Sequence, residues 1–151
     1  MTSISKFMEN NHRECDHLFA VAEESVANGK WQKAHSEFDA FRSETERHLK
    51  MEEEVLFPAF DAKTGMEGGP THVMRSEHQQ MRKVIDDMAQ ALGNKDGDAY
   101  LGLSETLMVL MQQHNMKEEN ILYPMCDTRL GAQSEAVVGN LSHRLAREHA
   151  A

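Results

Sequence analysis

Two short segments of the chain each place a glutamate four residues after a histidine and end in a proline. They are residues 48–58, HLKMEEEVLFP, and residues 114–124, HNMKEENILYP, which align without a gap at an offset of 66 residues. Residues four apart in a helix share one face and lie about 6 Å apart along its axis. The imidazole of such a pair can bind one metal ion while the carboxylate reaches a second, so the spacing indicates a two-metal site.

The chain has nine histidines, and this spacing alone does not select the pairs that bind metal. Four such pairs occur: His12/Asp16, His35/Asp39, His48/Glu52 and His114/Glu118. The last two lie on apolar helical stripes, where burying an unpaired imidazole or carboxylate costs several kcal/mol. His35 and Asp39 lie in a strongly polar stretch, so we expect them to form a solvated pair.

An acid–histidine dipeptide precedes each of the two repeated segments. Asp16-His17 comes before the first and Glu77-His78 before the second, so the chain contains two similar helix pairs. Assembled antiparallel, the two pairs bring four histidines and two carboxylates to a common centre. His12 lies five residues from His17 and faces elsewhere. We expect it at the surface, with a role beside the site or at its entrance as the alternative.

The donor types distinguish between metals. Mixed nitrogen and oxygen ligation with open positions suits redox-active iron, whereas structural zinc sites are closed, four-coordinate and usually rich in cysteine. The chain has two cysteines, Cys15 and Cys126, too few for a disulfide framework, so we expect reduced thiols. Both are expected as small core residues, with reactive thiols as the alternative.

The elements that must position these residues are helices. Turn signals at Asn28-Gly29, at residues 64–70, at residues 93–97 and at Gly131 separate five segments, 3–27, 30–62, 71–92, 97–129 and 134–149. Apolar residues recur in them at steps of three and four, the pattern of a bundle seam. Short connections then predict an all-α, up-down-up-down antiparallel four-helix bundle over residues 3–129. A short C-terminal helix over 134–149 follows, with Ser134 as its N-cap, and residues 1–151 are expected to form a single domain.

Composition limits the classes of partner. The formal charge of −9 is spread along the chain without basic blocks, which argues against nucleic acid or an anionic membrane surface as partners. No apolar run approaches the ~20 residues of a spanning helix, and the first residues lack the apolar core of a signal peptide. We therefore expect a cytoplasmic protein.

The order His…His-x-x-x-Glu…His…His-x-x-x-Glu, with Leu-Phe-Pro and Leu-Tyr-Pro following, resembles the hemerythrin-like (HHE cation-binding) family from about His12 to Asp127. The resemblance implies a four-helix bundle around a non-haem di-iron centre. The ligands that it implies are His17, His48, Glu52, His78, His114 and Glu118. Glu52 and Glu118 would bridge the two iron ions alongside an oxo or hydroxo group.

Two departures from the oxygen-carrying hemerythrins are visible. Met74 stands four residues before His78, where those proteins have a further histidine, and Glu118 lies four residues after its histidine, where they have an aspartate at five. The pattern is closer to bacterial di-iron proteins linked to nitric-oxide stress and iron–sulfur cluster repair. Met74 is expected to shape the access pocket, and His72 replaces the absent histidine only if its helix begins irregularly. Tyr123 is expected to serve packing, with a redox role as the alternative.

These observations leave three hypotheses for function. The first is a sensor, carrier or stress-response protein that binds or reacts with O2, NO or H2O2. The second is a redox enzyme, such as a nitric-oxide or peroxide reductase, or an iron donor in iron–sulfur cluster repair. The third is a helical interaction module with a zinc or empty site. The expected partner is the small ligand, with a second copy of the chain or a redox protein as possible additions.

Overall fold

The computed structural model describes residues 2–66 and 68–150, and the side chains of all of these except residues 147–150. The helices and helical turns are, in chain order, α1 (Ile4–Ala27), α2 (Trp31–Met51), η1 (Glu52–Leu56), α3 (Phe57–Thr64), α4 (Pro70–Gly93), α5 (Gly97–Lys117), η2 (Glu118–Leu122), α6 (Tyr123–Leu130), η3 (Gly131–Gln133) and α7 (Ser134–Ala150). The turns η1 and η2 are π-helical and η3 is a 3-10 turn. The π-turns join α2 to α3 and α5 to α6 without a break.

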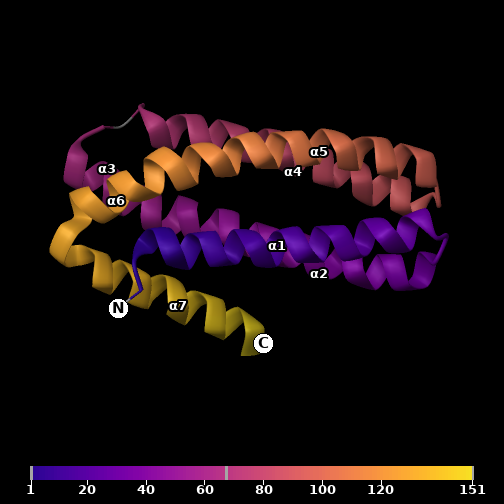
Figure 1. Cartoon of the computed structure of the whole chain (residues 1–151), viewed down its shortest axis with the longest axis horizontal. Coiled ribbons are helices and arrows are strands. Elements are labelled where there is room, and N and C mark those ends of the chain that lie inside the picture. Colours follow the sequence, from indigo (N-terminus) through magenta and orange to yellow (C-terminus); the bar gives the residue numbers. More distant parts are fainter. Residues whose placement is uncertain (1, 67, 151) are drawn as a thin grey trace.

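Four long rods lie antiparallel and form the bundle (Figure 1). They are α1, then α2 with η1 and α3, then α4, then α5 with η2 and α6. α1 packs against α2 and α4 against α5, so two hairpins make the bundle, and α7 returns alongside it. The described part of the chain has no strand. The predicted all-α, up-down-up-down fold with a C-terminal helix is therefore confirmed.

Short polar side chains cap the starts of two helices. Ser3 caps α1 by accepting a hydrogen bond from the Lys6 N–H, and Asp96 caps α5 by accepting one from the Ala99 N–H. The prediction that Ser134 is an N-cap is wrong. Ser134 already has helical dihedral angles, because the 3-10 turn runs directly into α7, and its hydroxyl donates to the Asp127 carbonyl at 3.4 Å.

A belt of polar residues divides the apolar core into two clusters. The turn-end cluster comprises Phe19, Ala22, Val26, Ala34, Phe38, Phe41, Leu49, Met81, Ile85, Met88, Ala91, Leu92, Tyr100, Leu107 and Met111. The α7-end cluster comprises Ile4, Met8, Met51, Leu56, Phe57, Phe60, Met74, Leu122, Tyr123, Cys126, Leu130 and Leu141. The polar belt between them is thus shielded from water along the bundle axis on both sides.

The two π-turns lie at equivalent places of the repeated segments. In each, an N–H bonds a carbonyl five residues back, from Phe57 to Glu52 and from Tyr123 to Glu118. Pro58 and Pro124 follow directly, and a proline has no N–H for the α-helical bond to the carbonyl four residues back. π-turns of this kind are inserted single residues that often mark functional sites. Here each one begins at a glutamate of the predicted metal site.

Each hairpin also secures the start of the other. Asp127 in α6 accepts hydrogen bonds from the backbone N–H groups of Ile4 at 2.8 Å and Ser5 at 3.2 Å, in the first turn of α1. Its repeat counterpart Asp61 in α3 accepts from the Thr71 hydroxyl at 2.8 Å, in the first turn of α4. Asp127 thereby satisfies backbone N–H groups at a helix N-terminus that have no partner within the helix, whereas Asp61 binds a side-chain hydroxyl. They fix α1 and α4 against the rods that carry the glutamates.

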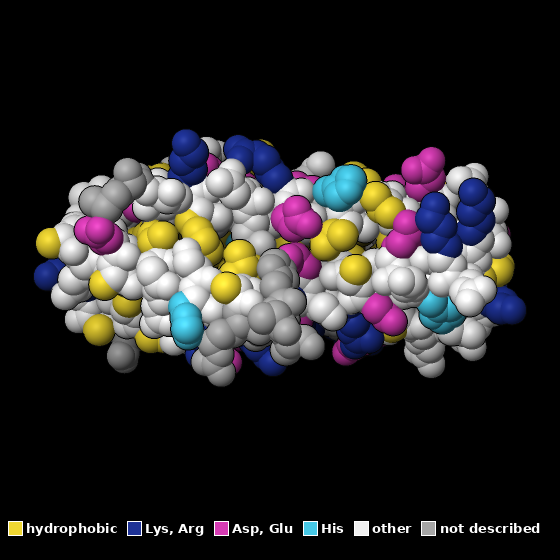
Figure 2. Space-filling view, turned by 90° about the horizontal axis from the view of Figure 1, so that it is seen from below, with side chains coloured by type: hydrophobic (Ala, Val, Ile, Leu, Met, Phe, Trp, Pro, Cys, Tyr) yellow, Lys and Arg dark blue, Asp and Glu magenta, His cyan; other side chains and the backbone are white. Residues whose placement is uncertain are grey.

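The outer surface carries mixed charge. Acidic and basic side chains are interspersed on the face that carries α7 (Figure 2).

Among the helices of residues 2–66 and 68–150, none combines the length and the hydropathy that crossing a bilayer requires.

The capping role of Asp127 gives a first prediction. Asp127→Ala should lower the free energy of unfolding by about 1 kcal/mol, because two N–H groups of α1 lose their acceptor. Urea denaturation measures the change. Asp39→Ala, an exposed aspartate of α2, is the control and should stay within ~0.5 kcal/mol of the wild type. Equal losses in the two variants would contradict the role of Asp127.

Candidate metal centre

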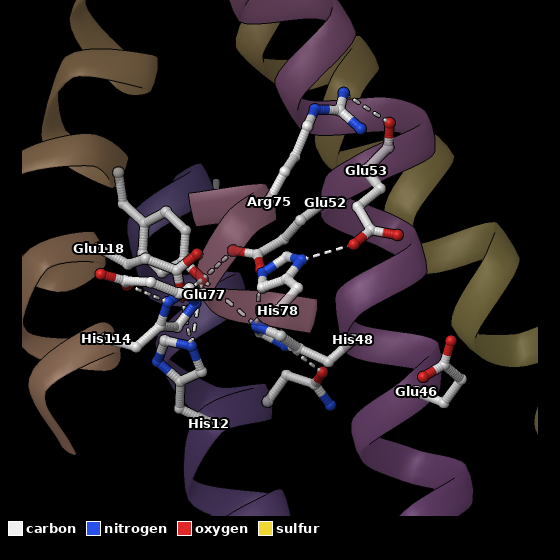
Figure 3. Close-up of polar contacts among 12 residues, drawn as sticks. His12, Glu46, His48, Glu52, Glu53, Arg75, Glu77, His78, His114 and Glu118 are labelled. Carbon is white, nitrogen blue, oxygen red and sulfur yellow. Dashed lines mark hydrogen bonds and ion pairs between the residues drawn. The ribbon is translucent and has the colours of Figure 1, made fainter. Parts of the chain in front are cut away.

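Six titratable side chains fill the polar belt at the centre of the bundle (Figure 3). They come from all four rods and are no more than 4% exposed: His12, His48, Glu52, His78, His114 and Glu118. The structure thus brings together five of the residues that the sequence analysis names as ligands. The sixth position is occupied by His12 and not by His17.

The predicted placement of His17 at the centre is wrong, and so is the expected surface position of His12. His17 is exposed on α1, whereas His12 is buried on the stripe that also carries Met8 and Cys15. Residues five apart on a helix point about 140° away from each other, so only one of the two histidines can face the axis. The repeat contains the signal for the correct choice, because the offset of 66 pairs His12 with His78.

Each cluster histidine directs Nε2 towards a buried glutamate. The Nε2 atoms of His12 and His114 lie 3.0 and 3.2 Å from Oε1 of Glu118. Those of His78 and His48 lie 3.0 and 3.6 Å from Oε1 of Glu52. Glu118 is therefore approached by His114 from its own rod and by His12 from α1. Glu52 is approached by His48 from its own rod and by His78 from α4.

The Nδ1 atom of each histidine bonds to an oxygen outside the cluster. The pairs are His12 with Glu119 at 2.7 Å, His48 with Asn11 at 2.6 Å, His78 with Glu53 at 2.7 Å and His114 with Glu77 at 2.8 Å. An oxygen of a carboxylate or of a side-chain amide can only accept here, so each Nδ1 carries the proton and donates it. In a neutral imidazole the lone pair is then on Nε2 and points to the centre, as in carboxylate–histidine–metal sites.

Glu77, the residue before His78, accepts from His114 on α5 and so serves a histidine of another helix. Asp16, the residue before His17, is exposed. Glu53 and Glu119 were missed, although each stands next to a glutamate of the repeat. Their position directly after the paired residue in both copies is the signal that could have found them.

Charge and burial perturb the cluster strongly. Burial alone would lower the pKa of His78, but its hydrogen bonds to Glu52 and Glu53 outweigh that effect and raise the pKa to about 9. His48 lacks a strong acidic acceptor, and burial lowers its pKa to about 3 against the opposing charge of Glu52. Burial also acts to raise the pKa of Glu118, but Glu52 and the neighbouring imidazoles hold it well below its ordinary value.

Two polar atoms of the cluster are left without a hydrogen bond. His114 Nε2 and Glu118 Oε2 are buried and make no hydrogen bond within the described residues. Buried polar atoms without a partner are rare and costly in folded proteins. Both belong to groups that bind cations well, so the donor set fits a metal.

Two groups of ligand atoms lie close enough to hold a metal ion each. One comprises Glu52, His78, His114 and Glu118, and the other His12, His48 and Glu118, with the atoms of each group within 4.8 Å of one another. Glu118 is common to both groups. The arrangement therefore suits two ions that share at least one carboxylate.

Comparison with known proteins agrees with this geometry. The family model of the hemerythrin HHE cation binding domain matches residues 3–126. The chain belongs to this family. Hemerythrin domains of this kind bind iron, and the His/Glu cluster is where this hemerythrin domain could hold the metal.

Curated relatives of this hemerythrin domain share part of its length. The iron-sulfur cluster repair protein YtfE of Yersinia pseudotuberculosis is 30% identical over 99 residues, 59% of this chain and 44% of the relative. The protein of the same name from Edwardsiella ictaluri is 30% identical over 98 residues, 58% of this chain and 44% of the relative. The chain thus spans less than half the length of these relatives. No solved structure matches it.

Other candidates of the sequence analysis lie outside the hemerythrin cluster. Met74 is buried in the α7-end cluster of the core. His72 and His35 are exposed, so neither joins the centre, and His35 is solvated as expected. Cys15 and Cys126 are buried free thiols, and burial raises the pKa of Cys15 to about 12.

Tyr123 contributes a hydroxyl to the centre, which its expected packing role did not include. It is fully buried and donates to Oε2 of Glu52 at 2.7 Å or to Oε1 of Glu118 at 2.9 Å. Burial and the charges of the two glutamates raise its pKa well above the ordinary value. Its repeat counterpart Phe57 has no hydroxyl and stacks on the His78 ring with the centroids 5.8 Å apart. The two halves of the hemerythrin cluster therefore differ at this position.

The exchange of His17 for His12 gives a second prediction. His12→Ala should lower the iron content of the reconstituted protein by about one ion per chain, because one nitrogen ligand is lost. His17→Ala, on the same helix, should leave it unchanged. Iron per chain, measured by elemental analysis, decides between them. Loss of iron in the His17 variant alone would restore the original assignment.

The hydroxyl of Tyr123 gives a third prediction. Tyr123→Phe should lower the free energy of unfolding of the metal-free protein by ~1–3 kcal/mol, because buried carboxylate oxygens lose a donor. Thermal and urea denaturation measure the effect. Tyr100→Phe is the matched control, since Tyr100 is equally buried but lies in the turn-end cluster of the core. A change of equal size in both variants would show that the hydroxyl is not what matters.

Proposed function

We propose that this hemerythrin domain binds two iron ions and that the centre binds or reacts with a small diatomic molecule or peroxide. The supporting observation is the convergence of four Nε2 atoms on two buried carboxylates, with every Nδ1 engaged by an outer oxygen. The proposed ligands are His12, His48, Glu52, His78, His114 and Glu118. This set replaces His17 by His12 and keeps the other residues.

Both glutamates are proposed as bridging ligands, together with an oxo or hydroxo group. Glu118 belongs to both groups of ligand atoms. Glu52 is approached by His78 and His48 from two different rods. A carboxylate between two imidazoles that serve different ions is well placed to bridge them. Four histidines and two glutamates also leave positions free for an exogenous ligand.

The residues around the centre prepare it for small-molecule chemistry. The two core clusters exclude bulk water, which strengthens electrostatic interactions within the centre. The acceptors Glu53, Glu77, Glu119 and Asn11 fix the orientation of the imidazoles. Tyr123 holds a proton between the two carboxylates. When bound, iron would supply open coordination positions and the electrons for O2, NO or peroxide.

A second candidate function comes from the names of the relatives. Two proteins that share 30% identity with this chain are named iron-sulfur cluster repair proteins. In this second proposal the same centre serves as a source of iron for damaged clusters. This second proposal rests on the names of the relatives, and more than half of the length of each relative lies outside the match to this chain.

Metal loading tests the proposed function. Reconstitution with ferrous iron should give two iron ions per chain, oxo-bridge absorption bands after oxidation, and a melting temperature above that of the metal-free protein, because a ligand of the native state stabilises it. Glu118→Ala should lose the bands and most of the thermal shift, whereas His35→Ala should keep both. Zinc in place of iron, or a wild-type protein that binds no metal, would refute the di-iron proposal.

Three reactions then separate the roles. Nitric oxide binding to the reduced protein without turnover would support a sensor or carrier. Sustained consumption of nitric oxide or peroxide with a reductant would support an enzyme. Transfer of iron to a metal-free iron–sulfur protein would support a role in repair.

A further inference from the structure

A small cavity borders the metal centre on the side of the turn-end cluster. The centre of a water-sized sphere can move through a volume of about 20 Å³ in it. Three of the cluster histidines, His12, His48 and His114, form one of its walls. That volume holds roughly one small molecule. The other walls include Cys15, Thr45, Met81 and Met111, all of them buried. The cavity is therefore an extension of the centre into the core, on the side opposite to Tyr123.

Thr45 is the unusual residue in this cavity. Its side chain is 4% exposed, and its Oγ1 atom has no hydrogen-bond partner within the described residues. A buried hydroxyl without a partner is destabilising. The thiol of Cys15 lies within hydrogen-bonding reach of this hydroxyl, but sulfur is only a weak hydrogen-bonding partner, so the contact compensates little of the cost of burying the hydroxyl.

Two other threonines of the chain satisfy their hydroxyls within their own helix. Thr64 donates to the Phe60 carbonyl at 2.8 Å, and Thr106 donates to the Gly102 carbonyl at 3.4 Å. Such bonds to the carbonyl four residues back are the usual solution for threonine in a helix. Thr45 makes no such bond. Its hydroxyl thus remains available to a molecule in the cavity.

The repeat shows that this polar wall belongs to one half of the centre. The offset of 66 residues pairs Cys15 with Met81 and Thr45 with Met111, and all four residues line the cavity. The first hairpin contributes a hydroxyl and a thiol, and the second contributes two thioethers. A diatomic molecule in this space would meet hydrogen-bond donors on one side and polarizable, apolar sulfur on the other.

We propose that this cavity receives a diatomic ligand held at the metal centre, and that the Thr45 hydroxyl donates a hydrogen bond to the ligand's outer atom. The proposal rests on the proposed function, since it assigns the subsite of the same centre. Thr45 then discriminates in favour of ligands whose outer atom accepts a hydrogen bond, such as dioxygen and nitric oxide. Met81 and Met111 limit the size of what fits.

Nitric oxide bound to the reduced, iron-loaded protein is the probe. Thr45→Val keeps the shape of the side chain and removes the hydroxyl, and Thr45→Ser keeps the hydroxyl. Ser104→Ala is the matched control, because Ser104 is also buried with an unpartnered hydroxyl but lies about 10 Å before Met111 along α5. Cys15→Ala separates the thiol from the hydroxyl. The readouts are the dissociation constant of nitric oxide, the N–O stretching band in H2O and D2O, and the melting temperature of each metal-free protein.

Thr45→Val should weaken nitric oxide binding about 5- to 10-fold, the effect of one hydrogen bond, and should abolish the shift of the N–O band in D2O. Thr45→Ser, Cys15→Ala and Ser104→Ala should keep that shift. The melting temperature of the metal-free Thr45→Val protein should not fall, because the hydroxyl loses at most a weak contact with the Cys15 thiol. A lower melting temperature with unchanged nitric oxide binding would assign the hydroxyl a structural role and overturn the proposal.

Failure of this proposal can be told apart from failure of the proposed function. If the wild-type protein loads no iron, or loads iron and neither binds nor consumes nitric oxide, dioxygen or peroxide, both proposals fail together. If it loads iron and reacts with peroxide but binds no nitric oxide or dioxygen, the cavity assignment alone fails. If the wild type binds nitric oxide and Thr45→Val binds it equally tightly with the same sensitivity to D2O, the cavity assignment alone is wrong.

Discussion

The structure depends on burying six titratable groups on the axis of a helical bundle. Four imidazoles and two carboxylates are almost completely removed from water, which is strongly unfavourable unless they are compensated. The chain offsets part of this cost with one hydrogen bond from the Nδ1 atom of each imidazole to an oxygen outside the cluster. The Nε2 atoms remain directed inward at the two carboxylates, and His114 Nε2 and Glu118 Oε2 make no hydrogen bond within the described residues. The folded chain therefore holds in its core a set of buried groups that a bound cation would stabilise.

The rest of the architecture serves this requirement twice over. Each hairpin supplies a single histidine, a His-x-x-x-Glu pair, a π-turn and an aspartate that secures the first turn of the other hairpin. Because each half closes the other, neither half has a complete site alone. The two halves nevertheless differ where they meet at the axis, with Tyr123 opposite Phe57 on one side of the cluster and Thr45 opposite Met111 on the other.

The repeat in the sequence was sufficient to predict the bundle, its helices and most of the central cluster. Polar residues on apolar stripes, such as His48 and Glu118, stand out because burial makes them costly. The choice of His17 failed because it matched the dipeptide Asp16-His17 to Glu77-His78, whereas the register of the repeat pairs His12 with His78. The roles of Tyr123 and Asn11 could not be predicted, because their contacts join rods that are distant in sequence and depend on the packing of the whole bundle.

The π-turns have a consequence for the register of the rods. In an uninterrupted α-helix, Glu118 and Tyr123 would point about 140° apart, and their contact at 2.9 Å would not form. The extra residue of η2 acts as a phase correction that restores both side chains to the same face. The same correction in η1 turns Phe57 towards His78. The π-helical geometry of these two turns therefore matters as much as the identity of the ligands: if either turn closed as an ordinary α-helix with its present residues, the side chains that follow, beginning with Tyr123 or Phe57, would rotate away from the axis while every ligand stayed in the sequence.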